Sequence, residues 1–264
     1  MGAEHSAGGM NAFLELTKLN DDYRKRGVLK AFLEGAGDGK RSFYIQLIEK
    51  YRKEWTLVPE WYSQRMKRYE TSLTHSSYTR FIVQNQSALV MGQGQSSILE
   101  THVTLHRIYG VPYLPGTAIK GVTAHYCHRY VGEEHVEFRI GGKYYNLLFG
   151  CEDQASRIHY HDAFPTEDTI GQALVLDVMT PHHHEYNLNG ESMKPPRDDD
   201  SPVPIPFLSV RADFQVLLSC ESVNEDSVAL LGLAQKLVVA AMEHEGIGGK
   251  INAGYGRFKK AAEL

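Results

Sequence analysis

The order of helix-like and strand-like segments predicts an α+β protein with one antiparallel sheet. Apolar residues recur at helical spacing over residues 118–130 and 225–245, and apolar or alternating segments typical of strands lie before and after each of these helices. The order is therefore strand, helix, strands, helix, strand. This is the split βαββαβ plan of ferredoxin-like and RRM-like folds, in which two helices cover one face of the sheet.

The chain before this core is predicted to be helical. Residues 1–9 are expected to form a disordered tail and residues 10–75 a helical N-terminal appendage, with Leu14 and Trp61 among its buried positions. The predicted core then spans residues 76–264.

Strands and insertions alternate along the predicted core. The strands are expected at residues 79–95, 157–165, 172–180 and 207–219, with a short last strand after Gly254. Residues 131–156 are expected to be an irregular insertion. Residues 182–206 are polar and rich in proline, which predicts a long exposed loop.

The second helix has recognisable ends. Asn224 is a plausible N-cap, and Gly246 suits the left-handed position that ends many helices. A glycine-rich stretch, Gly246–Phe258, follows the helix. A nucleotide-binding P-loop or a dinucleotide-binding turn needs a strand before its glycines and a helix after them. The order here is reversed, so the sequence predicts no nucleotide cofactor.

The stretch GIGGKINAGYGRF holds five glycines in residues 246–258. An ordered glycine costs about 0.5–1 kcal/mol relative to alanine in regular elements, so five of them indicate more than tight turns. Close approach of the backbone to a ligand would explain them, and the positive charges nearby suit an extended polyanion. The candidate contact residues are Gly248, Gly249, Lys250, Asn252, Tyr255 and Arg257. Among them, Tyr255 is expected to pack against or stack on a base.

A second candidate segment begins the first helix, in the sequence YLPGTAIKG. Pro115 and Gly116 predict a turn, and Thr117 is a plausible N-cap. Where a capping box would have Glu or Gln, the chain has Lys120. Positive charge near a helix N-terminus costs a few tenths of a kcal/mol, up to about 1 kcal/mol, unless an anion binds there. Lys120 either meets such an anion or points into solvent, and this motif favours neither.

Gly92, Gln93 and Gly94 form a third candidate segment. They end the first predicted strand, and in a split βαββαβ fold this strand can lie close to the connection between the last helix and the last strand. These residues and the glycine-rich stretch are therefore expected to shape one surface.

Charge is unevenly distributed along the chain. The net charge of −4 argues against an indiscriminate nucleic-acid binder. Residues 18–70 carry 13 Lys/Arg against 8 Asp/Glu and residues 246–264 carry 4 against 1, whereas residues 71–245 carry 11 against 21. Two basic regions on an acidic body predict a protein that holds RNA on one face and contacts protein elsewhere.

The sequence also predicts a cytoplasmic protein. Cys127, Cys151 and Cys220 are far apart and odd in number, which indicates reduced thiols. No apolar run approaches the roughly 20 residues of a membrane span, and no secretory signal is visible at the N-terminus.

A metal site is one alternative. His159, His161 and Asp162 alternate along a predicted strand, and His182 to His184 are further candidate ligands. The spacing is not diagnostic, and the principal prediction is that no metal binds.

A metal-independent endoribonuclease is the other alternative. It would need a base near the 2′-hydroxyl, an acid at the leaving oxygen and a cation for the phosphorane charge. The candidates for these roles are His102, His106, His125, Lys120 and Lys250.

Several segments together resemble a known family. They are, in chain order, VMGQGQSSILETHVTLHRIYGVPYLPGTAIKG, FGCED, IHYHDAFP, LDVMTPHHHEYN, DDDSPVPIPFLSV and GIGGKINAGYGRF. In this order they resemble the RAMP superfamily of CRISPR-associated proteins, and most of all the family of sixth subunits of type III-B (Cmr) effector complexes. The resemblance covers about residues 85–258, with the family's glycine-rich loop at residues 246–258. The family's Pro-Gly-Ser/Thr-x-x-Lys-Gly helix start falls at residues 115–121, with Lys120 as its lysine.

This resemblance implies a ferredoxin-like core of the RAMP type and a structural role in a ribonucleoprotein, without catalytic residues. It implies contact with the guide RNA toward its 3′ portion and with the duplex of guide and target RNA, in RNA-targeting antiviral defence. The implied protein neighbours are the backbone RAMP subunit, the small helical subunit and the first RAMP subunit. Base pairing would then supply sequence specificity while the protein reads backbone and shape. Related RAMP proteins cut CRISPR precursor RNA, so the endoribonuclease alternative stays open.

Overall fold

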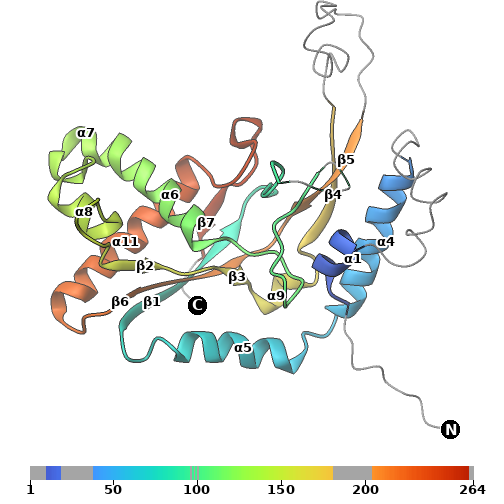
Figure 1. The fold of residues 1–264 in the computed structure, drawn as a ribbon, viewed down its shortest axis with the longest axis horizontal. Helices are drawn as coiled ribbons and strands as arrows, with labels where there is room; N and C mark the ends of the chain where they lie inside the picture. The colour runs from blue at the N-terminus through green and yellow to red at the C-terminus, as the bar shows by residue number, and fades with distance from the viewer. Residues whose placement is uncertain are drawn as a thin grey trace, which may run out of the picture.

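The computed structural model describes residues 10–18, 38–95, 97, 99, 101–180 and 204–261. Its α-helices are α1 (Ala12–Lys18), α4 (Asp38–Glu54), α5 (Glu60–Thr71), α6 (Gly116–Tyr126), α7 (Gly132–Glu134), α8 (Lys143–Phe149), α9 (Glu167–Ile170) and α11 (Glu225–His244). Shorter turns are the π-helix η1 (Cys127–Val131) and the 3₁₀ helices η2 (Val136–Phe138) and η3 (Ile251–Ala253). The strands are β1 (Ser77–Asn85), β2 (Ile158–Tyr160), β3 (Phe164–Pro165), β4 (Leu174–Met179), β5 (Ile205–Val210), β6 (Phe214–Cys220) and β7 (Phe258–Lys260) (Figure 1).

The main sheet is antiparallel and has β1 in its interior. β1 pairs with β6 on one side and β7 on the other, so that Val83 lies opposite Phe214 in β6 and opposite Lys260 in β7. β2 pairs with β6 as well, which gives the strand order β2-β6-β1-β7. β3 pairs with the other end of β6. The fold is therefore α+β with an antiparallel sheet, as predicted.

The two faces of the main sheet have different neighbours. Helix α11 packs against β1, β6, β7 and α6, and α6 packs against β2. Figure 1 shows both helices on one side of the sheet and α5 on the opposite side. Along β1, Phe81 and Val83 are buried, whereas Tyr78, Arg80 and Ile82 are exposed. The period-2 alternation of the strand thus separates a core face from an open face.

Helix α11 supplies much of the core and begins and ends as predicted. The side chain of Asn224 accepts the Ser227 N–H at 2.8 Å and caps the N-terminus. Gly246 follows the C-terminus with a φ of 81°. The apolar buried residues of α11 are Leu231, Ala234, Leu237, Val238, Ala241 and Met242.

The sequence analysis expected no apolar run near the length of a membrane span, and α11 corrects this expectation. By length and composition this helix is apolar enough to cross a membrane. In the structure its apolar side packs on the main sheet and on α6. Such burial is what an amphipathic core helix of a globular fold achieves.

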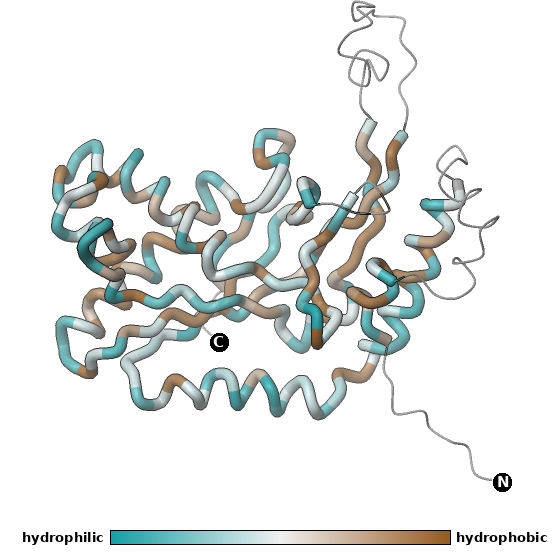
Figure 2. The backbone as a smooth tube through the Cα atoms, viewed as in Figure 1, coloured by the Kyte–Doolittle hydropathy of each residue, from teal (hydrophilic) through white to brown (hydrophobic). Residues whose placement is uncertain are grey.

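A second sheet consists of β4 and β5, which run antiparallel from Leu174 opposite Val210 to Met179 opposite Ile205. Helix α4 packs on both strands, and an isolated bridge joins Leu89 to Val210. Figure 2 shows hydrophobic residues concentrated in these strands. The single strand predicted at residues 207–219 is wrong, because β5 and β6 belong to different sheets.

The break between β5 and β6 is fixed by polar contacts of Asp213. Its carboxylate accepts the Asn85 N–H at 2.8 Å, and its own N–H donates to Thr169 Oγ1 at 3.0 Å. Its carbonyl accepts the Thr166 N–H at 2.8 Å. These bonds turn the chain where the alternation of the sequence suggested a continuous strand.

Helix α5 is attached to the chain around β3 by two tyrosines, of which Tyr62 is buried and Tyr69 half-buried. Tyr62 Oη donates to the Pro165 carbonyl at 2.9 Å, and Tyr69 Oη donates to the Asp162 carbonyl at 3.2 Å. The described part of residues 10–75 contains the helices α1, α4 and α5. The boundary between an appendage and a core at residues 75 and 76 stays a prediction.

Two burial predictions in the N-terminal segment are wrong. Leu14 is 49% exposed and Trp61 is 44% exposed. Trp61 packs at the edge of an aromatic group, with ring centroids 5.7 Å from Trp55 and 5.8 Å from Tyr109. Its neighbours bury only part of the indole, so a large apolar side chain at helical spacing was not enough to predict its environment.

The two predicted insertions fare differently. Residues 131–156 contain the short helices α7, η2 and α8 and are not irregular throughout. The predicted loop at residues 182–206 lies outside the described residues except at its end, where Ile205 and Pro206 already belong to β5. The predicted tail, residues 1–9, also lies outside the described residues.

Candidate RNA interface

The glycine-rich loop connects α11 to β7 and folds tightly against the end of the first strand region. Ile247 N–H donates to the Gly256 carbonyl at 2.9 Å, so the loop closes on itself. Gly249 N–H donates to the Val90 carbonyl at 2.7 Å, and Gly256 N–H donates to the Ala88 carbonyl at 2.8 Å. The predicted proximity of the first strand segment and the last helix-to-strand connection is confirmed by the bridge between Val90 and Gly249.

Two of the glycines are required by contacts within the protein itself. A Cβ on Gly256, whose φ is 72°, would lie 2.0 Å from the Ile247 carbonyl oxygen. A Cβ on Gly248, whose φ is 93°, would lie 2.4 Å from the Val90 carbonyl oxygen. Only glycine tolerates both the left-handed backbone and such an approach. Part of the glycine signal that the sequence attributed to a ligand is therefore explained by the fold.

The tip of the loop is exposed and closed by backbone hydrogen bonds. Lys250, Asn252 and Gly254 are exposed, and Lys250 has a left-handed backbone with a φ of 58°. The turn η3 follows, in which Ala253 N–H donates to the Lys250 carbonyl at 2.9 Å. Among the described residues Lys250 has no ion pair. The turn thus holds the backbone of Lys250 and leaves its side chain in solvent.

Tyr255 and Arg257 are used to hold the loop. Tyr255 Oη donates to Asp177 Oδ2 at 2.7 Å, and its ring lies 6.4 Å from that of Phe207. Burial, followed by the hydrogen bond to Asp177 and its charge, raises the pKa of Tyr255 to about 12. The guanidinium of Arg257 donates to the carbonyls of Glu243, at 3.3 Å, and His244.

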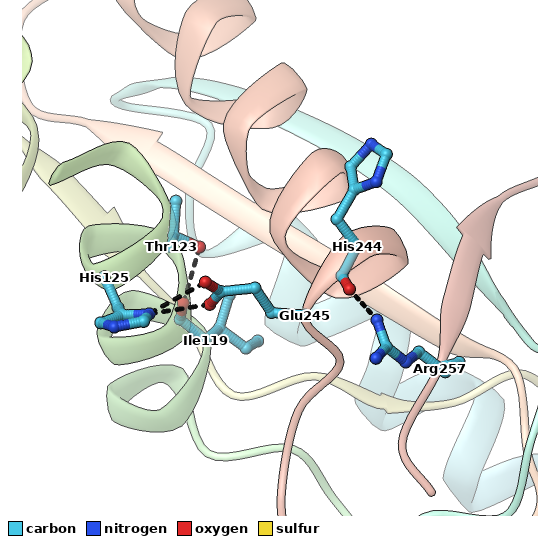
Figure 3. Close-up of polar contacts among 6 residues, drawn as sticks. All are labelled: Ile119, Thr123, His125, His244, Glu245 and Arg257. Carbon is cyan, nitrogen blue, oxygen red and sulfur yellow. Dashed lines mark hydrogen bonds and ion pairs between the residues drawn. The ribbon is translucent and has the colours of Figure 1, made fainter. Parts of the chain in front are cut away.

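Arg257 therefore binds the C-terminal end of α11, where carbonyl groups lack helical partners (Figure 3). A cation at this end also interacts favourably with the helix dipole. In this structure the Arg257 side chain supports the fold beneath the loop, and Lys250 is the cation that the loop presents.

The start of α6 differs from its prediction. Pro115, with an extended backbone, is the N-cap, so the prediction that Thr117 caps the helix is wrong. The helix begins at Gly116, which makes Lys120 its fifth residue and places it beyond the first turn. The expected conflict between Lys120 and the helix dipole is correspondingly weak, because the dipole effect falls off within the first turn.

The acceptor at this helix start is a side chain of the protein. Asp162 Oδ1 accepts the Gly116 N–H at 2.7 Å. A Cβ on Gly116 would lie 2.0 Å from the Tyr160 carbonyl oxygen, so glycine allows the helix to approach the segment after β2. The sequence offered Asp162 only as a metal ligand, and nothing local to Gly116 pointed to it. On the outer side of α6, Thr117 is exposed and Lys120 half-buried.

Gly92 is also packed too closely against its own chain to carry a side chain. Its φ is 82°, and a Cβ there would lie 2.6 Å from Thr104 Oγ1 and 3.1 Å from a ring carbon of His102. Gln95 N–H donates to the Gly92 carbonyl at 2.9 Å and closes a turn over Gln93 and Gly94. Gly94 is exposed, and a Cβ on it would have no atom within 4 Å.

Helices α6 and α11 meet at their C-terminal ends, directly before the loop. His125 Nδ1 lies 2.9 Å from Glu245 Oε2, and the ring of Tyr126 stacks on that of His244 at 6.0 Å (Figure 3 for the ion pair). The first residues after α11 are thus tied to α6 by Glu245. The last turn of α11 is tied to the chain before β7 by Arg257. The helix that carries Lys120 and the loop that carries Lys250 are parts of one connected unit.

The histidines that the sequence offered for a metal site or an endoribonuclease site contact other parts of the protein. His106 stacks on Tyr109 at 4.2 Å, and burial lowers its pKa. His125 pairs with Glu245, and His161 Nε2 lies 2.7 Å from Ser219 Oγ. Within the described part of the chain no group of three or more His, Cys, Asp or Glu is placed to hold a metal ion. His182 to His184 lie outside that part.

An α+β fold with a glycine-rich loop between its last helix and its last strand is what the resemblance to RAMP proteins implied. The sequence profile of the RAMP superfamily matches residues 84–259. The chain belongs to the RAMP superfamily.

Among RAMP proteins the chain is similar to Cmr6 subunits of CRISPR systems. It is 30% identical to the Cmr6 subunit of Pyrococcus furiosus in a match that covers 65% of this chain and 65% of that protein. It is 24% identical to the Cmr6 subunit of Saccharolobus solfataricus over 164 residues, 61% of this chain and 49% of that protein. The matched region is thus less than two thirds of the length of either relative.

A solved structure has the same fold. A chain of the type III-B Cmr-beta complex bound to cognate target RNA superposes with a TM-score of 0.63 at 19% identity, covering 92% of this chain and 77% of that chain. The resemblance to type III-B RAMP proteins, predicted from the ordered motifs, is confirmed by these matches.

Proposed function

We propose that this protein is a non-catalytic, RNA-binding structural subunit of a cytoplasmic type III-B CRISPR (Cmr) effector complex. It contacts the guide RNA toward its 3′ portion and the duplex with target RNA, and it packs beside the backbone RAMP subunit, the small helical subunit and the first RAMP subunit. RAMP membership and the similarity to Cmr6 subunits support this assignment.

The core that carries this function is a ferredoxin-like, RRM-like βαββαβ unit of the RAMP type. The strand order β7-β1-β6-β2 supports it, because the connections β1-α6-β2 and β6-α11-β7 each pass through a helix on the same face. Strands β3, β4 and β5 are then additions between β2 and β6.

The observation that carries the proposal is the exposed, hydrogen-bonded tip of the glycine-rich loop with Lys250 at its surface. The turn holds the backbone of Lys250 away from the body of the protein, so its ammonium group can reach a phosphate of an RNA backbone. Lys120 on α6 is the second proposed phosphate contact. The remaining proposed border residues are Gly92, Gln93, Gly94, Gly116, Thr117, Gly248, Gly249 and Asn252, while Tyr255 and Arg257 hold the loop in shape.

Lysine substitutions in the assembled complex test RNA binding. For single-stranded RNA, each phosphate contact contributes about −0.7 to the slope of log K, the binding constant, against log salt concentration. Loss of one contact therefore makes this slope about 0.7 less negative and, at 0.15 M salt, lowers the affinity about 4-fold. Lys250→Ala and Lys120→Ala should each weaken retention of a 3′-labelled guide RNA by about this factor, measured by filter binding over a range of KCl concentrations.

The matched control is Lys50→Ala, which removes an exposed lysine of α4. Equal retention and equal salt slopes for all three variants would contradict the proposed interface. Incubation of the pure protein with labelled repeat RNA in the absence of metal tests the non-catalytic role. One site-specific product that disappears in His102→Ala would show the endoribonuclease activity instead.

A further inference from the structure

The open face of the main sheet carries a groove that the proposed RNA interface does not use. Two adjoining cavities of about 530 Å³ and about 510 Å³ share Arg80 and Gln215 as lining residues. The first extends toward α5 and includes Tyr78, and the second extends toward β7 and includes Ile82. We call this surface, lined by Tyr78, Arg80, Ile82, Gln84 and Gln215, the β1 groove.

The floor of the β1 groove is a strand with exposed apolar side chains. Tyr78 and Ile82 are each 37% exposed, and β1 pairs with β6 from Ser77 to Val83 but with β7 only from Val83 to Asn85. Side chains on one face of a sheet normally pack against another layer. Helix α5 covers this face only in part, since its Met66 and Glu70 line the wall of the groove.

The length of the groove suits an extended chain. A strand rises about 3.3 Å per residue, so the floor from Tyr78 to Gln84 spans about 20 Å, room for about six residues of extended chain. On the β7 side, β7 pairs only with Val83 to Asn85. Among the described residues, the edge of β1 before Ile82 has no strand partner on that side. Unpaired backbone groups at such an edge accept an added strand.

Charge indicates which polymer the groove accepts. Arg80 is paired with Glu70 at 3.1 Å, so its charge is locally neutralised. The lining also carries the carboxylates of Glu167, Asp168 and Asp213, of which that of Asp213 accepts the Asn85 N–H. Only Lys67 and Lys260 bring further positive charge to the lining. Apart from the Arg80–Glu70 pair, the lining thus holds three carboxylates against two lysines. The adjacent, exposed carboxylates of Glu167 and Asp168 would repel a phosphate backbone and attract a lysine or arginine side chain.

We infer that the β1 groove docks an extended segment of a neighbouring protein subunit that carries apolar and basic side chains. The apolar side chains cover Tyr78 and Ile82, and a basic side chain meets the carboxylates of Glu167 and Asp168. This inference rests on the proposed function, because it takes the occupant from a complex in which the protein is a subunit.

Photo-crosslinking in the assembled complex tests the inference. Tyr78 is replaced by p-benzoylphenylalanine, and the same residue is placed at Val228, 65% exposed on α11, as the control. The expected result is a crosslink from position 78 to a Lys- or Arg-containing peptide of another protein subunit, at least about 5-fold above the yield from position 228. A crosslink to RNA, or a yield equal to the control, overturns the inference.

Charge reversal gives a second, independent measurement. Glu167→Lys combined with Asp168→Lys should weaken co-purification with the neighbouring subunit at least about 10-fold, because like charges then face each other. Glu133→Lys combined with Glu134→Lys on α7, both exposed, is the matched control and should have no effect. Equal co-purification of both variants contradicts the inference.

The outcomes distinguish the two proposals. If the unmodified protein does not co-purify with other Cmr subunits and guide RNA, the proposed function fails. If it does, and position 78 crosslinks to no protein, only the β1 groove inference fails. Unchanged unfolding midpoints confirm that the substitutions leave the fold intact.

Discussion

Substitution of Gly256 by alanine measures how far the glycine-rich loop depends on contact with its own chain. The new Cβ would lie 2.0 Å from the Ile247 carbonyl oxygen, where ordinary van der Waals contact begins at 3.4 Å. The obstructing atom is backbone, so no side-chain rotation relieves the overlap. The loop would have to open by more than an ångström, which breaks the hydrogen bonds of Gly256 to Ile247 and Ala88, 2.9 Å and 2.8 Å long.

The size of the effect follows from three contributions. A non-glycine residue in the left-handed region costs about 1 kcal/mol, and each lost backbone hydrogen bond costs about 1 kcal/mol. Gly256→Ala should therefore lower the free energy of unfolding by about 3 kcal/mol. For a chain of this size that corresponds to a decrease in Tm of about 6–12 °C.

Two other glycines provide matched controls. Gly254, with a φ of 88°, has no atom within 4 Å of a Cβ position, so Gly254→Ala should cost only the backbone strain of about 1 kcal/mol. Gly121 lies in α6 with open space around it, and Gly121→Ala should stabilise the protein by about 0.5–1 kcal/mol. Urea unfolding followed by circular dichroism gives all three values. Equal destabilisation by Gly254→Ala and Gly256→Ala would refute the close approach of Gly256 to Ile247.

Two further predictions concern long-range polar contacts. Asp162→Ala removes the acceptor of the Gly116 N–H and should destabilise the protein by about 1–2 kcal/mol. Asp162→Asn keeps an acceptor and loses only the charge, so it should cost about 0.3–1 kcal/mol. Equal urea unfolding midpoints for the two variants would show that the hydrogen bond contributes nothing. The pKa of Tyr255 is raised from its ordinary value of 10.0 to about 12, so the folded state keeps this proton where the unfolded state has lost it. That contribution to stability is fully present below pH 10 and is lost between pH 10 and about 12. The unfolding free energy of the wild type should fall more steeply over this range than that of Tyr255→Phe, and parallel curves would contradict the assignment.

Local patterns predicted the elements of the fold well where the signal lies within a few residues. The caps of α11, Asn224 and Gly246, were correct because an N-cap and a left-handed C-terminal residue act on the next turn of the same helix. The start of α6 was misplaced by a similar local argument. Thr117 has the chemistry of a cap, but Pro115 already fixes an extended backbone two residues earlier.

The candidate site was predicted in outline but not in its internal contacts. The partners that decide it are far apart in sequence: Asp162 lies 46 residues from Gly116, Asp177 lies 78 residues from Tyr255, and Glu245 lies 120 residues from His125. No spacing rule connects such pairs. Arg257 was predicted to face a ligand because it follows a glycine-rich stretch, and only the fold shows that the end of α11 lies within its reach.

The glycine-rich loop is held by both sheets of the fold. Its backbone is hydrogen-bonded to Ala88 and Val90, which precede it by more than 150 residues, and Tyr255 donates to Asp177 in the second sheet. A substitution that displaces β4, the strand that contains Asp177, should therefore move the loop tip at Lys250, although β4 is far from the loop in sequence.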